Sequence, residues 1–142
     1  MNAMTIPMEY QQASRDFERF LADACDIAML QTRNQTYTMV QGVLQVFRRR
    51  LSLSEGIFFA NALPPVLRAI FIADWDLAEP VRAFEDHAVM TREVQSLRRD
   101  HNFSPGSAIR DVAAALRRNI DEATFDRVLG HLPKGAQEFW RI

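Results

Sequence analysis

Apolar residues recur at spacings of three and four along most of the chain, which is the pattern of amphipathic helices. After a lead-in without periodicity, residues 1–8, the first such stretch covers residues 9–30. A second runs from Thr36 to about residue 51, and the Thr36 hydroxyl is a candidate N-cap. No stretch combines sustained strand alternation with turn dipeptides. The pattern predicts an all-α fold, a compact helical bundle.

Two short helices are predicted next. Ser52 and Glu55 have the spacing of a capping box, so a third helix is expected to begin after Ser52. Its predicted buried face comprises Ile57, Phe58, Ala60 and Leu63. Pro64 and Pro65 end this helix and are tolerated in the first turn of a fourth, over residues 65–73. The expected inward side chains of the fourth helix are Val66, Ile70 and Phe71.

The rest of the chain repeats this plan after a linker, residues 74–80. Residues 81–101 are predicted to form one long helix with its inward face at Phe84, Ala88, Val94 and Leu97. Ser104 and Pro105 predict the start of the next helix, as an N-cap followed by proline at the first helical position. Asp121 is the expected cap of the helix after that. The apolar stripes of these two helices are Ile109, Val112, Ala113, Leu116 and Ile120, and Phe125, Val128, Leu129 and Leu132.

A single register relates the two halves, which indicates an internal duplication. Adding 69 to a residue number matches identical residues without a gap: Val43 with Val112, Arg48 and Arg49 with Arg117 and Arg118, and Leu63-Pro64 with Leu132-Pro133. We therefore expect one domain over residues 9–142, composed of repeat one (9–73), the linker (74–80) and repeat two (81–142). The repeats are expected to form a pseudo-two-fold bundle, each covering the apolar face of the other.

Composition is that of an ordered globular protein, since 48% of the 142 residues are hydrophobic and 25% are charged. The formal net charge of −1 argues against a polyanion-binding protein, which is usually clearly basic. The apolar runs are far shorter than the about 20 residues that span a bilayer. The N-terminus lacks a signal-peptide pattern, so a cytoplasmic location is expected.

Motifs for catalysis and cofactor binding are not found in the sequence. His87, His101 and His131 lack the i, i+4 spacing of a helical zinc site. The single cysteine, Cys25, excludes an intrachain disulfide and lies beside an apolar stripe, where a thiol is usually inert. The glycines form no phosphate-binding loop, and no G-x-S-x-G is present. We therefore expect no catalytic residue, cofactor or metal, and an enzyme is the least favoured class.

Arginine clusters are the most suggestive polar feature. They comprise Arg48, Arg49 and Arg50, then Arg98 and Arg99, then Arg117 and Arg118. Two interpretations stay open. The clusters could contact phosphate groups, or they could simply place cations at the predicted helix C-termini, where the helix dipole favours them. The near-neutral net charge favours the second interpretation and makes nucleic acid an unfavoured partner.

The two tryptophans have different expected places. Trp140 aligns with Phe71 in the 69-residue register and is expected in the core with its N–H at the edge. Trp75 lies in the linker between two aspartates and is expected to pack across the seam between the halves. The alternative is an exposed Trp75 that anchors a protein partner. Trp75 is therefore added to the arginine clusters as a candidate interaction surface.

The order of the short motifs resembles that of a known family. Arg49-Arg50-Leu51-Ser52, Leu63-Pro64 and Trp75-Asp76 follow one another as in the bacterial family called domain of unknown function 2267. The resemblance covers nearly the whole chain. The second half keeps Leu132-Pro133 but has Arg118-Asn119-Ile120-Asp121 in place of the first motif. The resemblance implies an α-helical, duplicated, cytoplasmic protein, and it brings no established activity, cofactor or catalytic residue.

Three classes of function remain. The first expectation is a small non-enzymatic protein-interaction or stress-linked accessory module. The second is an apolar-ligand-binding protein with a cleft between the repeats, for which a pocket larger than about 300 Å³ would be evidence. The residues expected to line that cleft are Phe47, Phe59, Leu116 and Val128. The third is weak nucleic-acid or anion binding through the arginine clusters. Partner identity and oligomeric state are left open.

Overall fold

The computed structural model describes residues 5–142, and all regular structure within them is helical, which confirms the all-α prediction. The elements of the first half are α1 (Met8–Gln11), α2 (Ala13–Ala28), α3 (Arg33–Arg48), α4 (Leu53–Ala60) and α5 (Pro65–Ile72). Residues 73–86 form a connection without helix. The remaining elements are α6 (His87–Ser96), the 3₁₀ turn η1 (Arg99–His101), α7 (Ala108–Asn119), α8 (Glu122–Gly130) and α9 (Lys134–Phe139).

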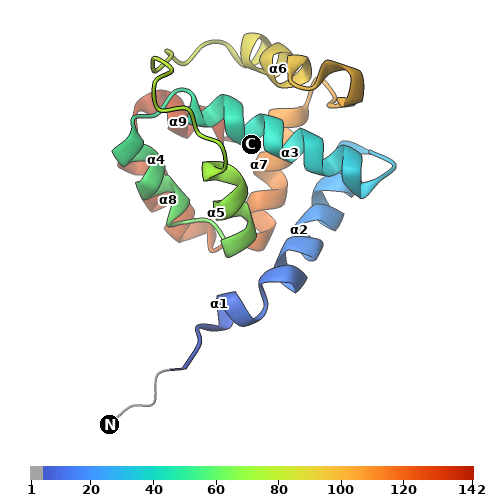
Figure 1. The fold of residues 1–142 in the computed structure, drawn as a ribbon, viewed down its shortest axis with the longest axis vertical. Helices are drawn as coiled ribbons and strands as arrows, with labels where there is room; N and C mark the ends of the chain where they lie inside the picture. Colours follow the sequence, from blue (N-terminus) through green and yellow to red (C-terminus); the bar gives the residue numbers. More distant parts are fainter. Residues whose placement is uncertain (1–4) are drawn as a thin grey trace.

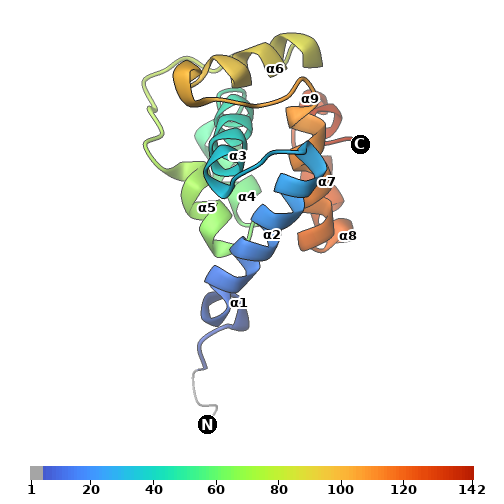
Figure 2. The same cartoon turned by 90° about the vertical axis from the view of Figure 1, so that its right-hand side faces the viewer.

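The helices are arranged around α3, which contacts α2, α5, α6 and α7. The most extensive pairing in the fold joins α2 to α7. Figure 1 shows α6 lying across the body on the side away from α1, which extends toward the N-terminus. In the rotated view, α5 lies on one side of α2, and α7, α8 and α9 lie on the other (Figure 2). Of the predicted lead-in, residues 1–4 fall outside the described part, and α1 begins at Met8.

An aromatic cluster occupies the centre and joins the two halves. The ring centroid of Phe47 lies 4.7 Å from that of Phe59, 4.9 Å from that of Phe139 and 5.2 Å from that of Trp140. Phe59 and Trp140 are stacked, with 15° between their planes. All four side chains are completely buried. The prediction that Trp140 belongs to the core is confirmed, but the expected place of its N–H at the edge is wrong, because Nε1 is buried and has no hydrogen-bond partner among the described residues.

Two pairs of helix starts follow the predicted register, whereas the starts of α3 at Arg33 and α7 at Ala108 do not. Leu53, the first residue of α4, lies 69 residues before Glu122, the first residue of α8. Pro65 of α5 lies 69 residues before Lys134 of α9. Of these two matched pairs, α4 and α8 are also neighbours in space, and α3 contacts α7. The correspondence does not extend to the first segment of each half, and the duplication stays a prediction.

The prediction of one long helix over residues 81–101 is wrong. The helix α6 begins only at His87, because the preceding backbone pairs with the end of α3 instead of with itself. The amide of Arg82 donates to the carbonyl of Arg49 at 2.9 Å, and Arg50 Nε donates to the carbonyl of Ala83 at 3.1 Å. Among the residues predicted to point inward, Ala88 is exposed.

The start of α7 also differs from the prediction. The helix begins at Ala108, and Ser104 is a buried residue of the preceding loop rather than an N-cap. The Asn102 side chain organises this loop. Its Nδ2 donates to the carbonyl oxygens of Val94 at 2.7 Å and Leu97 at 2.6 Å, and its Oδ1 accepts from the amide of Ser104. A side-chain clamp of this kind fixes a loop that helix periodicity alone does not reveal.

Two N-caps agree with the sequence pattern and one does not. Ser52 and Glu55 form the predicted capping box, and Asp121 caps α8 by accepting from the amide of Thr124. The cap of α3 is Thr32 rather than Thr36, because Gln35 completes a capping box with Thr32. The hydroxyl of Thr36 is buried within the helix and donates to the carbonyl of Thr32 at 2.9 Å.

The inward faces of α4 and α5 are rotated relative to the prediction. In α4 the buried residues are Gly56, Phe59 and Ala60, whereas Ile57 and Phe58 are exposed. In α5 the buried residues are Leu67 and Phe71, whereas Val66 and Ile70 are only partly buried. A short helix with apolar residues on all sides does not show from its sequence which side faces the core.

Candidate functional site

The first arginine cluster lies at the end of α3 and turns into the protein. Arg48 is only 7% exposed. Its Nη1 donates to the carbonyl oxygens of Phe71 at 2.7 Å and Ala73 at 2.9 Å. Its guanidinium carbon lies 5.5 Å from the ring centroid of Trp75. Arg48 therefore satisfies free carbonyl groups at the C-terminal end of α5 and is almost entirely buried.

Arg50 and Glu93 form a buried ion pair that ties α6 to α3. The side chain of Arg50 has no exposed surface, and its Nη2 lies 2.9 Å from Glu93 Oε1 and 3.1 Å from Glu85 Oε1. Arg49 Nη1 donates to the second oxygen of Glu93, also at 2.9 Å. Burial by itself raises the pKa of the Glu93 carboxyl, but the hydrogen bonds from Arg50 and Arg49 outweigh it and hold that pKa below its ordinary value.

A hollow of about 210 Å³ lies beside this network. Its lining brings together Arg49 of the first short motif with Trp75 and Asp76 of the last. Asp74 and Glu79 also line it, and Glu79 is itself 3.5 Å from Arg49. Arg48 lines it too. The three carboxylates outnumber the two arginines, and both arginines already have partners, so the hollow has no net positive charge. The first cluster therefore lacks the free cations that an anion site needs.

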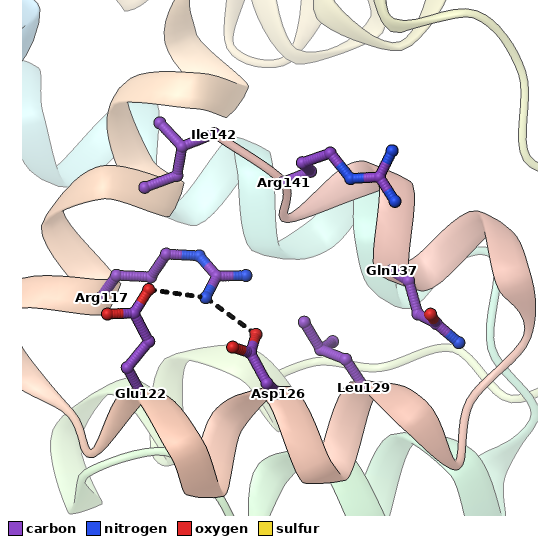
Figure 3. A pocket seen from close by; sticks show the side chains of 7 residues that line it. All are labelled: Arg117, Glu122, Asp126, Leu129, Gln137, Arg141 and Ile142. Atoms are coloured by element: carbon purple, nitrogen blue, oxygen red, sulfur yellow. Dashed lines mark hydrogen bonds and ion pairs between the residues drawn. The ribbon is translucent and has the colours of Figure 1, made fainter.

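In the second half, Arg117 occupies a comparable place (Figure 3). Its Nε donates to the carbonyl of Trp140 at 3.1 Å, and its Nη1 contacts Glu122 at 3.2 Å and Asp126 at 2.8 Å. These groups line a surface hollow of about 420 Å³, together with Leu129, Gln137, Arg141 and Ile142. The charges of two arginines, Arg117 and Arg141, balance those of two carboxylates, Glu122 and Asp126, so this hollow has no strong electrostatic potential of either sign.

Arg48 and Arg117 make equivalent contacts at positions 69 residues apart. Each donates to the carbonyl of the residue 23 positions later, Phe71 or Trp140. Each also lies over an aromatic ring, which is Trp75 for Arg48 and Phe125 for Arg117, at 5.5 and 5.2 Å respectively. The two rings come from different places in the two halves.

Gly56 explains this difference, because it is the counterpart of Phe125 in the 69-residue register. A Cβ atom on Gly56 would lie 2.2 Å from Cη2 of Trp75. The indole ring of Trp75 therefore fills, from the linker, the space that Phe125 fills from within α8. Its ring also packs on Phe71, with centroids 6.0 Å apart. These contacts of Trp75, with Arg48, Gly56 and Phe71, all lie in the first half, so they give no support to the prediction that it packs across the seam.

The predicted apolar cleft between the repeats is filled by side chains. Phe47, Phe59 and Leu116 are completely buried, and Val128 is partly buried. The rings of Phe139 and Trp140 lie against Phe47 at contact distance. The hollows described above have other linings. The packing thus gives no support to binding of a small apolar ligand at this place.

Two of the histidines and the single cysteine make hydrogen bonds to backbone carbonyl groups. His87 Nε2 is 3.1 Å from the carbonyl oxygen of Glu138, and His131 Nδ1 is 2.9 Å from that of Arg127. The Cys25 thiol donates to the carbonyl of Leu30 at 3.1 Å. Over residues 5–142, no group of three His, Cys, Asp or Glu side chains could hold a metal ion. Among the arginines of the three clusters, Arg98, Arg99 and Arg118 are exposed and make no side-chain hydrogen bond or ion pair within residues 5–142.

An apolar surface on α4 is the feature that the sequence pattern missed. Leu53, Ile57 and Phe58 are 47%, 51% and 41% exposed. Leu53 and Ile57 are four residues apart and so lie on one line along the helix. The ring of Phe58 lies beside His131 at the end of α8, with centroids 5.7 Å apart. We name these three side chains the α4 ridge.

The fold and these contacts define a small all-helical domain whose buried arginines join helix ends and loops. No helix among the described residues has the length and apolar character to cross a bilayer. The sequence matches the family described as uncharacterized conserved protein (DUF2267) over residues 17–139, and the chain belongs to that family. No protein of curated function matches it. The resemblance drawn from the short motifs is confirmed, and the family match carries no activity with it.

The crowding at Gly56 predicts a sign change in a double-mutant cycle. Gly56→Ala should destabilise the protein by about 1–3 kcal/mol, because the new methyl group overlaps the ring of Trp75. In a Trp75→Ala background the same change should stabilise it by up to about 1 kcal/mol, through helix propensity alone. Urea unfolding of the four variants measures both values. Additive effects would contradict the assignment of Trp75 to this space.

The buried pair predicts unequal costs for two similar substitutions. Glu93→Gln should destabilise the protein by about 2–4 kcal/mol, because Arg50 then loses the charge of its main partner while buried. The matched control is Glu122→Gln, which removes an exposed partner of Arg117 and should cost about 0–1 kcal/mol. If chemical denaturation gave equal losses in the free energy of unfolding for the two variants, burial would not determine how much these ion pairs stabilise the protein.

The lowered pKa of Glu93 predicts a pH dependence. A carboxyl whose pKa is lower in the folded than in the unfolded protein stabilises the fold. This contribution is complete above the unfolded pKa, near the ordinary value of 4.5, and it is lost as the pH falls through the folded pKa. The stability difference between the wild type and Glu93→Gln should therefore be full at pH 7 and shrink below about pH 4.5. Urea unfolding at a series of pH values measures it. A difference that stays constant down to pH 3 would refute the assignment.

Proposed function

We propose that this protein is a non-enzymatic interaction module that binds a helical segment of another protein through the α4 ridge. The single observation that carries the proposal is the exposure of Leu53, Ile57 and Phe58 on one short helix. An isolated exposed apolar side chain needs no explanation, but neighbouring ones mark interaction sites. The absence of a metal-binding group among residues 5–142 is compatible with a binding role but does not by itself support one.

The shape of the ridge favours a helical partner. Leu53 and Ile57 are spaced by one helical turn, and such a ridge packs into the groove of another helix. The polar neighbours suggest the charge of the partner. His131 lies beside Phe58, and Arg127 is exposed one turn earlier on α8. An amphipathic helix with acidic residues along one flank therefore suits this surface.

The small size of the ridge indicates a weak, reversible contact. Three partly exposed side chains bury far less than the about 1,200 Å² of a stable standard-size interface. A weak contact of this size suits an accessory protein that binds and releases its partner. A cytoplasmic location and a role in stress responses are parts of the same proposal, and they await cellular measurements.

The double substitution Ile57→Ser with Phe58→Ser should abolish partner binding while leaving the fold intact. Surface changes of this kind alter stability by about 0.5 kcal/mol each, against 2–5 kcal/mol for a core residue. Site-specific photo-crosslinking from position 54, beside the ridge, would identify the bound segment in the native host. Competition by a synthetic peptide of that segment would measure its affinity.

The matched control is Leu77→Ser with Val81→Ser, which removes two apolar side chains, 61% and 60% exposed, from the connection between α5 and α6. The control should bind the partner as the wild type does. Binding that survives the ridge substitutions, or is lost equally in the control, would refute the proposal. Crosslinks between copies of this chain, together with dimerisation in sedimentation velocity, would refute a foreign partner in favour of self-association.

A further inference from the structure

A third hollow, of about 360 Å³, lies between the first turns of α3 and the loop that precedes α7. Asn34 and Tyr37 line it from α3, and Arg98, His101 and Phe103 line it from the loop. Its volume is within the range of small-molecule sites, from about 300 to 1,000 Å³. It is distinct from the α4 ridge, and it contains Arg98, one of the arginines proposed from the sequence.

Most polar side chains of this hollow have no partner among residues 5–142, and the exception is Gln35, whose Oε1 accepts from the amides of Gln31 and Thr32. Within residues 5–142, the side chains of Asn34, Tyr37, Arg98 and His101 make no hydrogen bond or ion pair, although each lines the same space. This sets Arg98 apart from Arg48, whose Nη1 donates to two carbonyl groups. A guanidinium that is not used internally is available to an anion.

The loop holds Arg98 in a defined and unfavourable conformation. Its φ of 51° lies in the left-handed region, which a residue with a side chain rarely adopts. The loop is fixed on either side of this turn, because the Asn102 side chain bonds to the carbonyl groups of Val94 and Leu97. Backbone strain of this kind is found preferentially at ligand-binding sites, where the surrounding structure enforces it.

Two aromatic rings complete the hollow. Phe103 is 60% exposed, an unusual state for phenylalanine, and Tyr37 faces the same space from α3. No ring contact joins Tyr37 and Phe103 in the part of the chain that the structure describes. A planar group can therefore approach either ring. Stacking on aromatic side chains with a cation beside them is the physical basis of binding to nucleobases and their phosphates.

We propose that this hollow binds a nucleotide, with the phosphate on Arg98 and His101 and the base against Phe103 and Tyr37. The exposed Arg99 adds positive charge nearby, and Asp100 offsets part of it, so the site itself has enough positive charge to hold one or two phosphates. This local charge is compatible with the net charge of −1 for the whole chain. The nucleotide could be free or part of a single strand, since both present the same groups.

The test is to titrate each of four probes into the ¹⁵N-labelled full chain at low salt and to monitor binding through the amide chemical shifts. The probes are adenosine monophosphate, adenosine, inorganic phosphate and a ten-residue oligothymidylate. Adenosine monophosphate should shift residues 34–38 and 98–103 and bind at least about tenfold more tightly than adenosine or phosphate alone. Tighter binding of the oligonucleotide would identify a single strand as the source, and equal binding would identify the free nucleotide.

Arg98→Gly is the most informative variant because glycine adopts positive φ without strain. It should weaken binding of adenosine monophosphate at least about tenfold while the melting temperature stays the same or rises. Phe103→Ala should weaken it similarly. Arg118→Ala is the matched control, since it removes one exposed arginine from the last turn of α7 and should change affinity by no more than about twofold.

Three outcomes would overturn this proposal. The first is the absence of shifts at residues 34–38 and 98–103 at millimolar adenosine monophosphate. The second is a set of shifts confined to other residues. The third is equal loss of binding in Arg98→Gly and Arg118→Ala, which would show a general charge effect. None of these outcomes depends on the α4 ridge, so the two proposals succeed or fail separately.

Discussion

Contact between aromatic rings at Phe47 is the interaction on which the rest of the molecule depends. Phe47 comes from α3, and it touches Phe59 from α4 on one side and Phe139 and Trp140 from the C-terminal end on the other. Large aromatic side chains contribute more buried area than any other residues, and pairs of rings add specific geometry. The short helices α4, α5, α8 and α9 are each too short to be stable alone, and they are ordered because their apolar sides meet at this cluster.

Arginine fulfils the polar requirements that this packing creates. The core brings the ends of short helices inside, where their last carbonyl groups lose contact with water and need donors. Arg48 and Arg117 supply these donors through a planar group with five N–H bonds. Arg50 goes further, since it is buried with Glu93 and holds α6 and the connection before it against α3. Most of the clustered arginines therefore hold the fold together and are unavailable to a ligand.

The sequence predicted the features that depend on local chemistry. The capping box at Ser52, the cap at Asp121 and the core position of Trp140 were all accessible from residue types and spacing. The connection before α6 was not, because its backbone pairs with Arg49 and Arg50 from a distant element. The orientation of α4 was also hidden, since Ile57, Phe58 and Phe59 are equally apolar and only the fold decides which one is buried. The site around Phe103 could not be assembled from sequence, because its two sides are about 60 residues apart and no motif links them.

The position of Trp75 over Gly56 has a consequence for how the chain can be divided. The first half borrows a ring from beyond its last helix, whereas the second half carries its own ring, Phe125, within α8. A piece that stops at residue 73 would leave bare backbone at Gly56 and an uncovered guanidinium at Arg48. A division of the chain between the halves therefore has to fall beyond Trp75, so that the ring stays with α4. An insertion or a circularly permuted terminus would be better tolerated there than at the last residue of α5.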